Sequence, residues 1–194
     1  MTTRSTFPPR VRSWSALPAA NRNYCGGDVR IAFAAFAMFF LSAPADARGA
    51  VVYAGGAWVA IDRGNVCEAL TRSQKIAPKG MVQATAGFAF APDHRRWGEF
   101  HAQLSRVPRP GSSVMLQIGD QPFLLLARDG WAWSRGPLQE QAIIAAARNA
   151  SSMRIEARDP GGGRFTDPYL LDGAPTAIDA AAARCAARGA GKVR

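Results

Sequence analysis

The chain has 194 residues, of which 48% are hydrophobic and 20% are charged, and its formal net charge at pH 7 is +10. This length fits one domain, and the composition is that of a globular protein, which argues against a disordered or fibrous chain. The basic residues are mostly single arginines with acidic residues between them. Such scattered charge is typical of a solvated surface, so we predict no nucleic-acid partner.

The first 47 residues have the features of a targeting segment. An uninterrupted apolar run, residues 31–41, follows Arg30 and precedes the triplet Ala45-Asp46-Ala47. The run is about half the ~20 apolar residues that a spanning helix needs, and small residues flanking Asp46 suit a signal peptidase. We predict cleavage near Ala47 and a periplasmic or outer-envelope protein whose mature chain has no transmembrane span. An uncleaved anchor or a buried core helix is the alternative.

The translation start is also open. Residues 1–28 show no periodic pattern, and a start at Val29 would place Arg30 and the apolar run at the N-terminus, which is the layout of a secretory signal. In that case residues 1–28 would not be translated. Excluding residues 1–47 removes five of the 24 basic and two of the 14 acidic residues, so the mature net charge becomes +7.

The cysteine count changes in the same step. Excluding Cys25 leaves Cys67 and Cys185. In an oxidising compartment two cysteines form one bridge if the fold brings them together, so we predict a Cys67–Cys185 disulfide. Two separate buried thiols are the alternative, because connectivity cannot be read from a sequence.

The first half of the mature chain reads as strands. Short apolar runs bounded by Gly and Asn predict strands at residues 51–53, 58–61 and 66–70. In residues 100–104, Phe100 alternates with polar neighbours such as His101, so His101 is expected to face water. Residues 112–118 and 123–127 flank the turn formers 119–122 and predict a hairpin, whose second run lacks alternation and is expected to be covered on both faces.

The second half combines helices with a further hairpin. A breaker-free segment after Pro137 predicts a helix over residues 138–148. Residues 153–157 alternate strictly, and the turn at residues 159–163 leads into a strand at residues 165–171.

A last helix begins near residues 175–176, because its apolar residues recur at helical spacing: Ile178, Ala181, Ala182 and Cys185. We therefore predict an α+β fold, mainly an antiparallel sandwich-like sheet with two helices, the last at the C-terminus. Residues 48–188 form a single β-rich domain in this interpretation, and residues 189–194 form a flexible basic tail.

Catalytic signatures are absent from the sequence. There is no Gly-x-Ser-x-Gly elbow, His-Glu-x-x-His pair or Cys-x-x-Cys motif. His94 and His101 have no supporting motif, and the glycines at residues 161–163 precede a strand, which favours a hairpin turn over a phosphate loop. We predict a non-enzymatic protein with no catalytic residue, no metal and no cofactor.

Paired aromatic residues give a candidate binding surface. Trp131 and Trp133 lie on one face of an extended segment, where flat rings can stack on sugars or on a partner protein. With Arg95 and Arg96 they form the predicted surface. Packing of both tryptophans in the core or in an interface is the alternative.

Several segments together resemble the invasion-associated locus B family of Gram-negative envelope proteins. They are a strand at residues 153–157, a Gly turn at 163–165, a strand ending in Leu-x-Gly-Ala at 169–174 and an Ala-rich helix at 176–181. Trp58, the Cys67 strand and residues 104–119 are similar to the family's earlier segments.

The resemblance implies an exported β-rich domain, associated in some pathogenic relatives with entry into host cells, without established enzymatic residues. The leading hypothesis is an exported non-enzymatic envelope protein that binds an unidentified protein or envelope component. The alternative is a module that binds an acidic glycan or a lipid head group, and peripheral membrane contact stays open.

Overall fold

The computed structural model describes residues 49–191, so the predicted targeting segment, residues 1–47, lies outside the described residues. The strands are β1 (Ala50–Gly55), β2 (Trp58–Asp62), β3 (Cys67–Arg72), β4 (Thr85–Phe90), β5 (Trp97–Gln103), β6 (Val114–Ile118), β7 (Gln121–Arg128), β8 (Trp131–Trp133), β9 (Ser152–Arg158) and β10 (Arg164–Leu170), and the helices are α1 (Pro137–Asn149) and α2 (Ala174–Ala190). These elements confirm the predicted α+β class, mainly antiparallel β, with the second helix at the C-terminal end.

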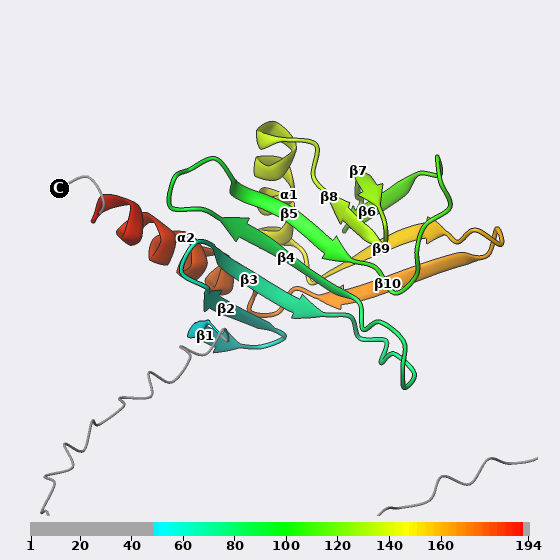
Figure 1. Ribbon diagram of the computed structural model, residues 1–194, viewed down its shortest axis with the longest axis horizontal. Helices are drawn as coiled ribbons and strands as arrows, with labels where there is room; N and C mark the ends of the chain where they lie inside the picture. The colour runs from blue at the N-terminus through cyan, green and yellow to red at the C-terminus, as the bar shows by residue number, and fades with distance from the viewer. Residues whose placement is uncertain (1–48, 192–194) are drawn as a thin grey trace, which may run out of the picture. The chain divides into compact units, whose positions relative to one another are not determined.

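The strands form one antiparallel sheet in the order β1-β2-β3-β4-β5-β8-β7-β6-β9-β10 (Figure 1). β7 joins its two parts, because residues 121–125 pair with β6 and residues 126–128 pair with β8. The sheet curls until β10 meets the exit of β3, where the Gln74 N–H and the Ser73 hydroxyl both donate to the Pro168 carbonyl, over 2.9 and 3.1 Å. The inner faces of the two parts therefore enclose one core, which gives the sandwich-like arrangement.

The inner face carries the large apolar side chains at a period of two residues, as expected for strands with one buried face. The Phe88 ring lies at the centre of the first part, 6.0 Å from the Trp58 ring and 5.5 Å from the Phe100 ring between centroids. Met153 and Ile155 of β9 are buried opposite them on the second part. The alternation predicted for β5 and β9 is thus confirmed.

Both predicted hairpins are present, with two differences in detail. β6 and β7 are joined by Gly119-Asp120, and Pro122 already pairs with Gln117 inside the ladder. The expectation that this second run is covered on both faces is wrong, because Leu126 is 52% exposed on the outer side of β7. A uniform leucine run does not reveal that only one of its faces, the one with Leu125, is packed.

The helices cover the inner side of the sheet. α2 packs mainly on β2 and β3, and α1 packs on β5 (Figure 1). The predicted face of α2 is buried at Ile178, Ala181 and Cys185. α2 continues through Ala190, so the first two residues of the predicted flexible tail are helical, and residues 192–194 lie outside the described residues.

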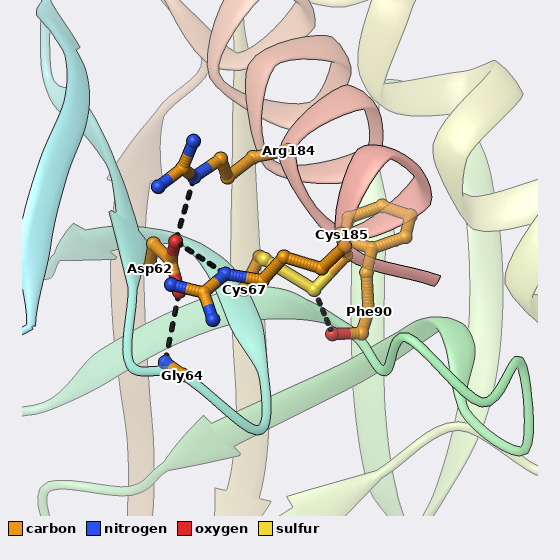
Figure 2. The surroundings of a disulfide bond; sticks show 7 residues. Asp62, Gly64, Cys67, Phe90, Arg184 and Cys185 are labelled. Atoms are coloured by element: carbon orange, nitrogen blue, oxygen red, sulfur yellow. Dashed lines mark hydrogen bonds and ion pairs between the residues drawn. A yellow bond between two sulfur atoms is a disulfide. The ribbon is translucent and has the colours of Figure 1, made fainter. Parts of the chain in front are cut away.

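A disulfide ties α2 to the sheet. Cys67 at the start of β3 is bonded to Cys185, with 5.7 Å between their Cα atoms and a sequence separation of 118 (Figure 2). Both cysteines are fully buried. The predicted pairing is confirmed, and it arises because Cys185 lies on the face of α2 that meets the β3 residues of inward register.

A buried carboxylate next to the disulfide adds a polar anchor for the same helix. The Asp62 side chain has no exposed surface and accepts hydrogen bonds from Nε of Arg184 and Nε of Arg188, at 2.6 and 2.8 Å (Figure 2). Its other oxygen accepts from the Gly64 N–H at 2.8 Å. Burial alone would raise the pKa of Asp62, but the Gly64 N–H and the two guanidinium groups hold it below the ordinary value.

Candidate binding groove

The outer face of the first part of the sheet carries rows of side chains that cross several strands. The register of β2, β3, β4, β5, β8 and β7 aligns one such row, which consists of Val59, Leu70, Gly87, His101, Trp133 and Leu126. A second, more polar row beside it consists of Arg72, Thr85, Gln103, Trp131 and Arg128. Side chains in such rows lie close enough to act together on one ligand.

The middle strand, β4, gives this face a low floor because it contributes Gly87 and Ala89. A Cβ at position 87 would collide with the Ala69 carbonyl oxygen and with the Leu70 side chain, so glycine is required there. Above this floor, side chains of β3 and β5 meet across β4. The Glu68 carboxylate lies 3.5 Å from Nε2 of His101, although their strands are not neighbours.

His101 is the most enclosed titratable group of this face. Only 13% of its side chain is exposed, so the expectation that it faces water is wrong even though it lies on the predicted side of β5. Burial lowers the pKa of His101, and the Glu68 carboxylate opposes this without cancelling it. Glu68 is fixed from the other side by Nε of Arg63 at 2.5 Å. The three side chains form a pre-arranged polar cluster.

A groove of about 880 Å³ opens over this cluster. Its lining includes Leu70, Glu68, His101, Arg72 and Trp131. A smaller hollow of about 320 Å³ continues toward the second tryptophan, Trp133. The groove is mainly apolar with a few convergent polar groups, which is the usual chemistry of a binding site.

The structure brings together most of the binding surface predicted from the sequence. Trp131 is 37% exposed and lies on the same face as Trp133, and both border the smaller hollow together with Arg96. Arg95 is separate from them, since its side chain is 88% exposed and pairs only with Asp93 at 3.6 Å.

The sequence did not indicate the other members of the site. Glu68 and Arg72 alternate with buried residues of β3, so the period of that strand could have placed them on the outer face. Leu124 and Leu126 extend the aromatic border, because they are exposed on the same face as Trp133. We call Leu124, Leu126 and Trp133 the apolar strip.

Two hydroxyl groups that line the groove have their hydrogen-bond partners in the backbone. The hydroxyl groups of Thr71 and Ser73 donate to the backbone carbonyls of Ala57 and Pro168, at 2.8 and 3.1 Å. Neither is hydrogen bonded to His101. Between residues 49 and 191, no three His, Cys, Asp or Glu side chains are grouped so that they could hold a metal ion.

The second histidine lies away from the groove. The His94 ring packs on the Trp97 ring with 4.2 Å between centroids, at the tip of the β4–β5 connection. Glu99 lies on the following strand, where burial raises its pKa while Arg96 opposes the rise. His94 borders a different hollow and is not part of the groove lining.

Comparisons of the chain with models of known protein families, with curated proteins and with solved structures find no match. Among the described residues, neither helix is both long and apolar enough to cross a membrane. Because one fold hosts many functions, the function has to be inferred from the residues of the groove.

Proposed function

We propose that this protein is an exported, non-enzymatic envelope protein of the invasion-associated locus B type, which binds a partner in the groove. It acts in the periplasm or the outer envelope after cleavage near Ala47. The buried Cys67–Cys185 disulfide supports this compartment, because such bridges persist where the surroundings are oxidising. The groove hydroxyls that are committed to backbone carbonyls support a binding role over an enzymatic one.

The observation that carries the binding role is the apolar strip beside the groove. Leu126 is more than half exposed and lies opposite the half-buried Trp133, and Leu124, two residues before it on the same face, is 36% exposed. Contiguous apolar and aromatic side chains on a surface are typical of interaction sites, and tryptophan is enriched among the residues that dominate binding energy. A protein partner that covers the strip is our leading proposal.

An acidic glycan is the second candidate, and the polar row favours it. Arg72 forms no ion pair with any described residue, and Thr85, Gln103 and Trp131 follow it across the sheet. A guanidinium group can bind a carboxylate or sulfate, while an indole ring stacks on a sugar face. Binding of such a polymer would weaken steeply with salt, whereas burial of the apolar strip would not.

Site-specific photocrosslinking in intact cells tests the proposal. A photoreactive residue is placed at Leu126, and a matched one at Gln121, which is exposed at the other end of the same strand. We expect the protein in the periplasmic fraction, and a discrete adduct from position 126 but none from position 121. Leu126→Lys should abolish an adduct formed from position 124.

The nature of the adduct separates the two candidates. Protease sensitivity and indifference to salt indicate the protein partner, and digestion by glycan-cleaving enzymes indicates the glycan. Equal adducts at positions 121 and 126 would show that the groove is not the binding site. Protein confined to the cytoplasmic fraction would refute export.

A further inference from the structure

One end of the sheet gathers connections that are far apart in the sequence. Because neighbouring strands are antiparallel, the β3–β4, β5–β6, β7–β8 and β9–β10 connections all leave the sheet at the same end (Figure 1). Hydrogen bonds confirm their contact: the Arg109 N–H donates to the Arg158 carbonyl at 2.7 Å, and the Leu104 N–H donates to the Gly130 carbonyl at 2.8 Å. We call residues 72–83, 104–113, 128–131 and 158–164 the loop end.

The loop end holds the positive charge of the described chain. It contains eight basic and two acidic residues, whereas the rest of residues 49–191 contains eight basic and ten acidic residues. The charge that is scattered along the sequence is thus concentrated in space. A local excess of this size attracts anionic surfaces.

The cations of the loop end are also mostly without carboxylate partners. Its two acidic residues each pair with one arginine, Asp159 with Arg106 and Asp129 with Arg128. Six cations form no ion pair with any residue between 49 and 191, namely Arg72, Lys75, Lys79, Arg109, Arg158 and Arg164. Outside the loop end, Arg135 alone of the described basic residues has no such pair.

Exposed apolar side chains project between these cations. Ile76 is 89% exposed, Met81 is 58% exposed and Val107 is 55% exposed. The β3–β4 and β5–β6 connections that carry them border a shared hollow of about 370 Å³, in which Met81 and Val107 both take part. Transfer of such apolar side chains out of water is favourable, and at a loop tip they are free to enter an apolar phase.

We propose that the loop end docks this protein onto an anionic phospholipid surface. The loop tips with Ile76, Met81 and Val107 enter the headgroup region, and the surrounding cations contact lipid phosphates. A soluble polyanion would use the cations alone and leave the apolar tips in water, so the combination fits a lipid surface best. This inference does not depend on what the groove binds, although Trp131 at the border of both would hold the groove next to the membrane.

Sedimentation with lipid vesicles tests the inference on the protein purified from cells. We expect binding to vesicles of phosphatidylglycerol with phosphatidylcholine, none to phosphatidylcholine alone, and weakening at high salt. Lys79→Gln should weaken partition about fivefold, the usual effect of one cation near an anionic surface. Ile76→Ser should weaken it as well.

Matched variants at other exposed sites serve as controls. Arg95→Gln removes an exposed charge and Leu138→Ser removes an 85% exposed leucine, both outside the loop end, and neither should change partition. Leu126→Ser, which disrupts the apolar strip without adding a charge, should leave partition intact, so a failure of the groove proposal can be told apart from a failure of this one. Equal effects of the controls would overturn the inference. So would a loss with Lys79→Gln but none with Ile76→Ser, because that result indicates a general polyanion site.

Discussion

The anchored helix α2 and the loop end use the same residue type for opposite purposes. At α2, Arg184 and Arg188 meet the buried Asp62 carboxylate beside the disulfide. At the loop end, Arg72 and Lys79 form no ion pair with a carboxylate of any described residue. The position of the acidic residues therefore decides which cations stabilise the fold and which are available for a partner.

The apolar residues repeat the contrast. Around α2 they are fully buried, as at Ile178 and Cys185, whereas Ile76 at the loop end is almost fully exposed. Burial of this kind contributes about 1.5–3 kcal/mol per large aliphatic side chain. Substitutions of buried residues near α2 should therefore lower the free energy of unfolding more than substitutions at the loop end. Exposed positions of the loop end should change stability by no more than about 0.5 kcal/mol.

The largest effect is expected from breaking the disulfide. Cys67→Ala with Cys185→Ala opens a loop closed over 118 residues, which lowers the free energy of unfolding by about 5 kcal/mol on the chain-entropy estimate. Denaturant unfolding of the variant and the parent measures the difference.

Reduction of the parent protein under denaturing conditions, followed by thiol blocking, serves as an independent route to the open chain. A loss below about 1 kcal/mol would show that α2 is held mainly by its packing and by Asp62, and not by the bridge.

A smaller loss is expected from Asp62→Asn, which keeps the shape and the acceptor for Gly64 but removes the charge. Because Arg184 and Arg188 are nearly half exposed, we expect a loss of about 2 kcal/mol at neutral pH, within the range for charge-assisted hydrogen bonds. Lys79→Gln at the loop end is the matched control and should cost no more than about 0.5 kcal/mol.

The pH dependence of this variant checks the cause. The pKa of Asp62 is held below its ordinary 3.8 in the folded state, so its contribution is complete above that pH and is lost as the pH falls through the folded pKa. The parent and Asp62→Asn should therefore converge in stability under strongly acidic conditions. A difference that persists there would mean that the side chain acts through packing.

Elements with a local pattern, such as β9 and α2, could be predicted from the sequence. Strict alternation defined β9, and helical spacing placed Cys185 on the buried face of α2. β4 was missed because Thr85–Phe90 is rich in Ala and Gly, which are poor strand formers, and is buried on both faces, so it shows no alternation.

The same gap explains what was missed at the candidate site. The sequence placed Trp131 and Trp133 on one face, but the Glu68–His101 contact spans two strands and crosses β4, the strand without a signal. The loop end was missed for a related reason. Its cations come from four connections, and only the antiparallel strand order brings those connections to one end.

The smallest effect concerns His101, and it sharpens the contrast between an enclosed and an exposed titratable group. Burial lowers the folded pKa of His101 below 6.5, so between these two values the unfolded chain binds more protons than the folded one. Acidification through this window therefore destabilises the parent. His101→Gln should abolish this step of the pH profile, and Glu68→Gln should deepen it, because the carboxylate partly offsets the burial.

Denaturant midpoints above and below pH 6.5 measure the step, and His94→Gln is the control that should leave it in place, since His94 lies outside the groove. A parent profile that is flat through this window would show that His101 takes up its proton in the folded state as easily as in water, and the enclosed cluster of Arg63, Glu68 and His101 would then have no electrostatic role in the groove.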